Sequence, residues 1–135
     1  MRLLLDEDYE RLKAQGLEWV EIPEHRFLIL KDFPLPEGLY TVSKANILVI
    51  IEARYPEAGH DMFWTAPRLV RTDGAAIPQT ENSGSASNHK VGDTEYHRWS
   101  RHWFDDMAGR WTPGKSNVIT ITQRITWALN SQPLT

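Results

Sequence analysis

The sequence contains no cysteine among its 135 residues. This absence excludes disulfide bonds, thiolate nucleophiles and cysteine-based zinc sites, and it is typical of a reducing compartment. Long apolar runs are absent as well, and the three leucines of "MRLLLDEDYE" are too few for a signal peptide. We therefore expect a cytoplasmic protein that has no membrane-spanning segment.

A surplus of basic residues is also missing. The chain has 15 Lys and Arg against 18 Asp and Glu, which gives a net charge of −3. Proteins that bind nucleic acids usually carry a basic face, so we expect no nucleic-acid partner. The hydrophobic fraction of 41% is ordinary for a globular protein, and the length fits one domain spanning 1–135.

The apolar pattern predicts an α+β fold. A first helix at 6–16 begins with acidic residues, with Asp6 as its cap, and ends at Gly16. A C-terminal helix follows "WTP", where Thr112 can cap a turn or a helix and Pro113 suits a first helical position. Between them we expect a four-stranded antiparallel meander and a long loop at 71–95. The predicted strands are 17–22, 26–33, 45–53 and 61–64.

Apolar residues at helical spacing predict which faces of the two helices are buried. The expected buried stripes are Leu5, Tyr9, Leu12 and Leu17 in the first helix and Val118, Ile121, Ile125, Ala128 and Leu129 in the second.

Five short motifs, in this order, resemble the prokaryotic ubiquitin-conjugating family E. They are "GLEWVE", "FPLPEGLY", "YPEAGHDMFW", "YHRWSRHW" and "WTPGKSNV". The resemblance covers nearly the whole chain and implies a ubiquitin-conjugating-enzyme-like fold with a long active-site loop. It also implies a bacterial conjugation pathway, with a ubiquitin-like protein and an activating-enzyme-like protein as partners. A peptidase of the same operon and a role in antiphage defence are further expectations from it.

The chain departs from active conjugating enzymes at the position that matters most. It lacks the cysteine that carries the thioester, and "SNHKVG" has Asn88 and His89 without the proline of a His-Pro-Asn triplet. In the family the nucleophile precedes the tryptophan of the W-S/T-P segment. Counting back from Trp111 reaches 101–103, and a small insertion at "DDMAG" would place Ser100 at the cysteine position.

Ser100 is therefore the predicted acyl acceptor, and it would form an oxyester. A serine hydroxyl is a weak nucleophile unless a base takes its proton, and the imidazoles of His102 or His97 can do so near neutral pH. Arg101, and also Arg98, can stabilise an oxyanion or a carboxylate terminus. We expect no cofactor.

Structural explanations for the same residues remain open. Ser100 would then only hydrogen-bond a loop, and Trp99 and Trp103 would pack in the core. A metal site made by three histidines and an aspartate is a weaker alternative, because the spacing matches no closed pattern. Its members would be His89, His97, His102 and Asp93 or Asp105. An unrelated serine hydrolase is not supported, because the sequence contains no G-x-S-x-G elbow and no obvious acid that would orient a histidine.

Other residues have mainly structural expectations. We expect Tyr55, Met62 and Phe63 in the core, Asp61 as an anchor of the long loop, and His25 and His60 at the surface. "TENSGSASNH" is expected to be a flexible lip, and a hidden nucleophile among its serines is the less favoured alternative. By analogy with the family fold, the first helix, acidic at its start and basic at Arg11 and Lys13, would meet the activating enzyme. A variant that binds these partners without carrying the acyl group is the alternative to an enzyme.

Overall fold

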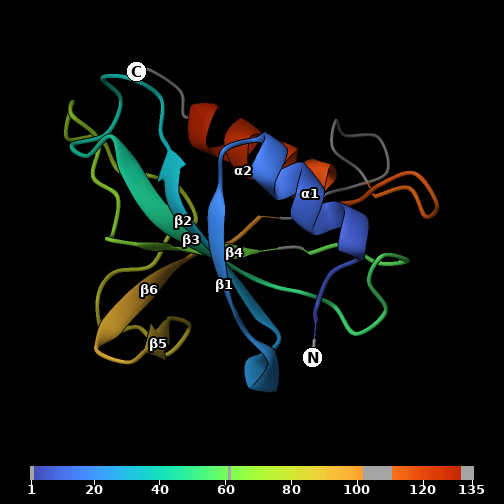
Figure 1. Cartoon of the computed structure of the whole chain (residues 1–135). Helices are drawn as coiled ribbons and strands as arrows, with labels where there is room; N and C mark the ends of the chain where they lie inside the picture. The colour runs from blue at the N-terminus through green and yellow to red at the C-terminus, as the bar shows by residue number, and fades with distance from the viewer. Residues whose placement is uncertain (1, 61, 102–110, 132–135) are drawn as a thin grey trace.

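The computed structural model describes residues 2–60, 62–101 and 111–131 of the chain. Within these residues it has two α-helices, one short 3-10 helix (η1) and a curled, six-stranded antiparallel sheet (Figure 1). The elements, in chain order, are α1 (Asp6–Ala14), β1 (Glu18–Ile22), η1 (Pro23–His25), β2 (Phe27–Pro34), β3 (Lys44–Ile50), β4 (Phe63–Ala66), β5 (His89–Val91), β6 (Thr94–Trp99) and α2 (Val118–Asn130).

The sheet is larger than the sequence indicates. Its strand order is β1-β2-β3-β4-β6-β5, so β5 and β6 extend the predicted four strands by two in the described part of the chain. The prediction of a continuous loop at 71–95 is therefore wrong for β5 and for the start of β6. Every pair of neighbouring strands is antiparallel.

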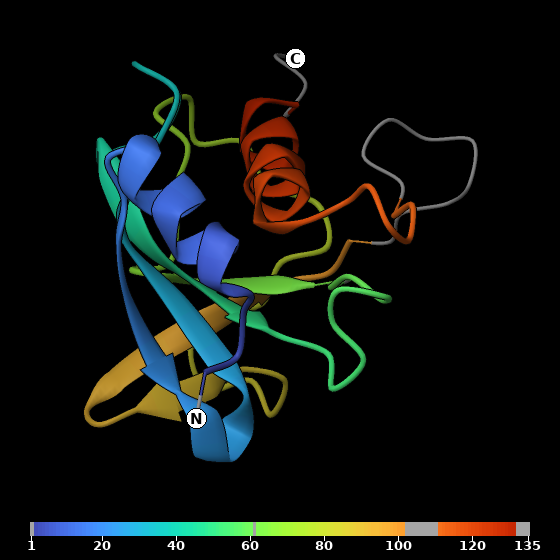
Figure 2. The same ribbon diagram turned by 45° about the vertical axis from the view of Figure 1, so that its right-hand side comes forward.

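Both helices cover the same face of the sheet (Figure 2). The main core fills the space between the two helices and the sheet. It contains all five residues of the stripe predicted for α2, so that prediction is confirmed. In α1 the predicted stripe holds for Tyr9, Leu12 and Leu17, whereas Leu5 is 40% exposed. Leu5 precedes the first turn as the N-cap residue, so it does not share the buried face.

A second, smaller core lies on the opposite face of the sheet. It contains Phe27, Ile29, Leu48, Trp64, Ala66 and Tyr96. His89 of β5 contacts Phe27 of β2 with ring centroids 5.0 Å apart, although three strands lie between β2 and β5 in the sheet order. The sheet is therefore curled, and the β5–β6 hairpin packs back across this face.

The helix α2 begins after Pro113, and Thr112 takes the turn, which is one of the two roles expected for it. Asn117, rather than Thr112, is the N-cap residue, and its side-chain oxygen accepts the backbone N–H of Ile119 at 2.8 Å. Thr112 instead closes a turn, in which its carbonyl accepts the N–H groups of Lys115 and Ser116. Neither described helix is long and apolar enough to cross a membrane.

Candidate functional site

The strand β6 leads directly into the predicted nucleophile. Trp99 is its last residue, only 1% exposed, and its ring stacks on Phe63 with centroids 5.2 Å apart. Tyr40 contacts the same indole ring edge-on at 6.4 Å. Trp99 is therefore a core residue, which agrees with the structural explanation, and it fixes the place where Ser100 leaves the sheet. Trp103 lies outside the described residues.

Ser100 is half-buried, and the neighbouring loop holds its backbone. Its N–H donates to the carbonyl of Gln79 at 2.8 Å, and its own carbonyl accepts from Arg101 Nη1 at 2.8 Å. The Ser100 hydroxyl has no hydrogen bond to the described part of the chain. The backbone of Ser100 is thus fixed while its hydroxyl stays unengaged there.

Arg101 has a structural environment. Its guanidinium lies over the Trp99 ring, 4.9 Å from the centroid, and Nη1 also donates to the Pro78 carbonyl at 3.3 Å. Burial lowers the pKa of Arg101 from its usual value. The side chain therefore ties the 78–80 segment to the end of β6, and it contacts the carbonyl of Ser100 rather than its hydroxyl. Arg98 pairs with Glu81 at 3.3 Å.

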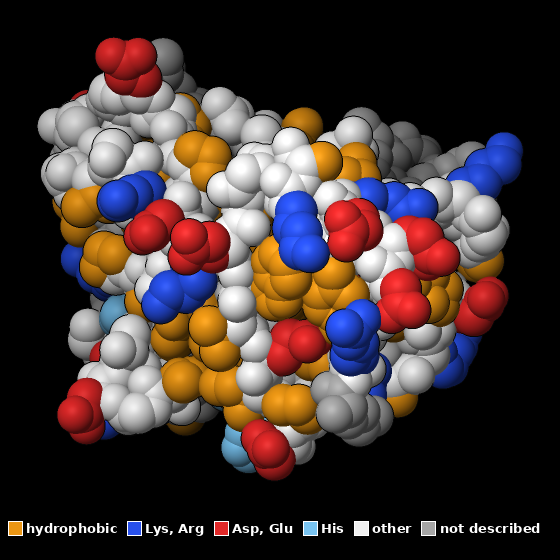
Figure 3. Space-filling view, in the orientation of Figure 1, with side chains coloured by type: hydrophobic (Ala, Val, Ile, Leu, Met, Phe, Trp, Pro, Cys, Tyr) orange, Lys and Arg blue, Asp and Glu red, His pale blue; other side chains and the backbone are white. Residues whose placement is uncertain are grey.

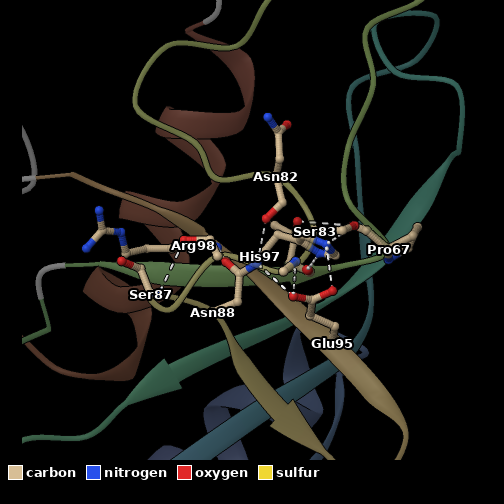
Figure 4. A network of polar contacts seen from close by, with 11 residues as sticks. Pro67, Asn82, Ser83, Ser87, Asn88, Glu95, His97 and Arg98 are labelled. Carbon is tan, nitrogen blue, oxygen red and sulfur yellow. Dashed lines mark hydrogen bonds and ion pairs between the residues drawn. The ribbon is translucent and has the colours of Figure 1, made fainter.

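His97 does not contact Ser100. Its ring is 6% exposed and lies on β6 opposite Thr65 of β4, whose carbonyl is 3.4 Å from His97 Nδ1. The other ring nitrogen, Nε2, is 3.1 Å from Ser83 Oγ and 3.6 Å from Glu95 Oε1 (Figure 4). The second predicted base, His102, lies outside the described residues.

A hydrogen-bond network holds the loop that carries Ser83. The amide nitrogen of Asn88 donates to the Asn82 carbonyl at 2.9 Å and to Glu95 Oε2 at 3.0 Å, and its oxygen accepts the backbone N–H of Arg98 at 3.0 Å. Gly84 N–H donates to the same Glu95 oxygen at 2.8 Å. This segment, predicted to be a flexible lip, is thus bonded to β6 at several points.

The sequence matches a protein-family model over nearly its whole length. The model described as prokaryotic E2 family E matches residues 4–132. The chain belongs to prokaryotic E2 family E. Searches among curated proteins and among solved structures found no match.

The absence of cysteine has a chemical consequence for a member of this family. The E2 family E chain is a ubiquitin-conjugating-like protein of a bacterial conjugation pathway, yet no residue of its sequence can carry a thioester. Interaction with a ubiquitin-like protein and an activating enzyme follows from the family in general terms. Any covalent step must therefore use an atom other than sulfur.

The histidines of this E2-like chain do not form a metal site in the described residues. No group of three or more metal-ligating side chains occurs there. His89 lies between the rings of Phe27 and Trp64, with centroid distances of 5.0 and 4.7 Å. Burial lowers the pKa of His89, and the nearby charge of His25 adds to this effect. Asp105, one of the proposed ligands, lies outside the described residues.

The segment "YPEAGHDMFW" matches most of its expectations. Phe63 is fully buried, and Tyr55 and Met62 pack against the two cores. His60, predicted at the surface, is instead 3% exposed. Burial, with the charge of Arg124 as a second cause, lowers the pKa of His60 to about 3. Asp61 lies outside the described residues.

The contacts that Ser83, Glu95 and Asn88 make around His97 were not predicted by the sequence analysis. Glu95 lies two residues before His97 on β6, Ser83 reaches the His97 ring from the loop before β5, and Asn88 binds Glu95 and the backbone of Arg98. The alternation along "TEYHRW" was the available indication of a strand, because it places His97 and Trp99 on one face.

Proposed function

We propose that this E2-like protein accepts the C-terminus of a ubiquitin-like protein as an oxyester on Ser100. The observation that carries the proposal is the complete absence of cysteine in a chain that matches the E2 family over nearly its whole length. The acyl group would come from an activating-enzyme-like protein. A peptidase of the same operon as a partner, and a role in antiphage defence, belong to the same proposal.

The surroundings of Ser100 support this chemistry in part. The residue follows a rigid strand end, its backbone is held by Gln79, and its hydroxyl is not used by the described part of the chain. The positive charge of Arg101 lies beside it and can attract a carboxylate terminus. Since His97 faces Ser83, the proposal assigns the role of base to His102.

The proposed step is an acyl transfer from sulfur to oxygen. The Ser100 oxygen attacks the carbonyl of the thioester on the activating enzyme, and the C–O bond forms as the C–S bond breaks. The hydroxyl proton passes to the His102 imidazole and then to the departing thiolate.

The experiment combines the purified chain with its activating enzyme, ATP and the ubiquitin-like protein. We expect a covalent adduct that alkali cleaves and that disappears in Ser100→Ala. In Ser100→Cys we expect an adduct cleaved by a thiol reductant, because the new thiol would form a thioester. An alkali-labile adduct that persists in Ser100→Ala contradicts the proposal.

A docking role without acyl transfer is the second candidate. The observation that favours it is that no imidazole in the described residues contacts the Ser100 hydroxyl, so the hydroxyl lacks a visible base there. This role predicts a complex with the ubiquitin-like protein or its activating enzyme without ATP, and no adduct when ATP is added. Calorimetry for the complex and mass spectrometry for the adduct separate the two candidates.

A further inference from the structure

We propose that Ser83 and His97, supported by Glu95, form a second nucleophilic site that accepts acyl groups from activated esters and thioesters. The site goes beyond the proposed function, because it uses a different hydroxyl and needs neither His102 nor Ser100. Its parts come from the loop before β5 and from β6, as Figure 4 shows.

The distances place an imidazole base next to the hydroxyl of an exposed serine. Ser83 is exposed, and its Oγ lies 3.1 Å from Nε2 of the buried His97 ring. Acceptor oxygens lie near both ring nitrogens, but the Thr65 carbonyl is within hydrogen-bond distance of Nδ1 at 3.4 Å, whereas Glu95 Oε1 lies beyond it from Nε2 at 3.6 Å. The contacts therefore favour the tautomer with its proton on Nδ1. In that tautomer Nε2 presents its lone pair to the Ser83 hydroxyl. This is the arrangement that general-base activation of a serine requires.

Glu95 supplies the charge that such a pair needs. Its Oε1 lies 3.6 Å from His97 Nε2, while its Oε2 accepts hydrogen bonds from Asn88 and Gly84. These two hydrogen bonds, with the Asn88 amide as the larger contributor, lower the pKa of Glu95. The carboxylate is therefore ionised near neutral pH and held in place, and it stabilises the imidazolium that forms when Nε2 takes a proton.

The turn that carries Ser83 is closed by two hydrogen bonds to the Asn82 carbonyl. The Ser85 N–H donates to the Asn82 carbonyl at 3.3 Å, and Asn88 binds the same carbonyl from the side of β5. Gly84 adopts φ of +84°, a conformation that L side chains rarely adopt, and this allows its N–H to reach Glu95. Serine and histidine are therefore preorganised before any substrate binds.

The chemical step is balanced without a further reactant. Ser83 Oγ attacks the acyl carbonyl while His97 Nε2 takes the hydroxyl proton, and an ester C–O bond forms. The bond between the carbonyl carbon and the leaving oxygen or sulfur breaks, and that leaving group receives the proton from Nε2. The product is an acyl ester on Ser83 and a free alcohol or thiol.

The first test is a fluorophosphonate probe, which phosphonylates activated serines with loss of fluoride. We expect one adduct by intact mass, located on Ser83 by peptide mapping. It should be absent in Ser83→Ala, slowed about 100-fold in His97→Gln, and unchanged in Ser85→Ala, a serine of the same turn. No adduct on the folded protein, or an adduct elsewhere in the chain, overturns the proposal.

The second test does not depend on a buried substitution alone. Because the chain lacks cysteine, Ser83→Cys introduces a single thiol, and Ser43→Cys introduces one at another exposed serine. An adjacent imidazole favours the thiolate, so we expect Ser83→Cys to react with iodoacetamide at pH 7 about tenfold faster than Ser43→Cys. Adding His97→Gln should remove the difference. Equal rates in Ser83→Cys and Ser43→Cys overturn the proposal.

Neither test uses the activating enzyme or the ubiquitin-like protein. A failure of the Ser83 site would therefore leave the proposed oxyester on Ser100 untouched, and a failure of the Ser100 experiment would leave the Ser83 site untouched.

Discussion

Asp8 is a buried carboxylate that joins three distant parts of the chain. It is fully buried, and its oxygens accept from the Leu5 N–H at 3.1 Å, the Tyr55 hydroxyl at 2.6 Å and the Val118 N–H at 3.4 Å. Arg11 pairs with it at 2.8 Å from a more exposed position. Since Val118 is the first residue of α2, the carboxylate also lies at the positive end of that helix.

We expect Asp8→Ala to lower the free energy of unfolding by about 3 kcal/mol, because several buried donors lose their acceptor together. Tyr55→Phe removes only one of these hydrogen bonds and should cost about 1 kcal/mol. Urea denaturation of both variants and the unmodified chain gives the comparison. Equal losses in the two variants would show that the Tyr55 bond accounts for the whole effect.

The buried imidazole of His60 should make the stability of the fold depend on pH. The folded protein keeps its imidazole neutral down to about pH 3, whereas the unfolded chain takes up a proton near pH 6.5. Stability from this group is therefore fully present above pH 6.5 and is lost as the pH falls from 6.5 towards 3. We expect the loss between pH 7 and pH 5 to be about 2 kcal/mol greater in the unmodified chain than in His60→Leu. Identical pH profiles would contradict this assignment.

At the scale of elements, the helix α2 depends on its cap. Asn117 accepts the Ile119 N–H, and Thr120 Oγ1 accepts the Asn117 N–H at 3.3 Å, so each satisfies a group that the helix leaves unpaired. β-Branched residues fill much of this helix and lower its intrinsic propensity. Its formation therefore relies on the cap and on packing against the sheet.

We expect Asn117→Ala to reduce the free energy of unfolding by about 1 kcal/mol and Asn117→Asp to retain most of it, because Asp keeps the capping oxygen. Thermal denaturation followed by circular dichroism measures both. A loss of similar size in Asn117→Asp would indicate that the amide nitrogen, rather than the cap, is what the fold requires.

Among the helices and strands, the buried face of α2 could be predicted from the sequence, whereas β5 was not predicted. The stripe from Val118 to Leu129 predicts the buried face of α2, because apolar spacing reports burial directly. The strand β5 is only His89–Val91, and turn-forming residues surround it. It pairs with the start of β6 across the two-residue turn Gly92–Asp93, a local hairpin signal that the sequence analysis did not use, and it packs against Phe27, which is distant in the sequence. The contact of Ser83 with His97 was missed because it joins residues 14 apart in the sequence, and that of Glu95 because β6 was not recognised as a strand there.

At the scale of the whole molecule, a groove lies between α1 and β1, beside the helix that is expected to meet the activating enzyme. Acidic and basic side chains alternate over this face, with hydrophobic atoms between them (Figure 3). The residues that line the groove are Arg2, Asp6, Glu7, Tyr9, Glu10, Lys13, Trp19 and Glu21. Two ion pairs, Arg2–Asp6 and Lys13–Glu10, are solvent-exposed and can exchange partners at little cost.

We expect Glu7→Lys to weaken binding of the activating-enzyme-like protein about tenfold at low salt, because it reverses a charge on this groove. Glu37→Lys changes the net charge equally on the exposed segment between β2 and β3, so it serves as the control. Calorimetry at about 0.05 M and about 0.5 M salt should show the difference shrinking as screening increases. Equal effects of the two variants would place the docking surface elsewhere.

The indole of Trp64 connects the smaller core to the segment before β5. Its Nε1 donates to the Ser87 carbonyl at 2.9 Å while its ring contacts His89, so a shift of that segment changes the polarity around one tryptophan. Acylation of a serine four residues away would then alter the fluorescence emission of Trp64. The fluorescence of Trp64 would therefore report on events at this turn, and Trp64→Phe would remove that contribution to the emission.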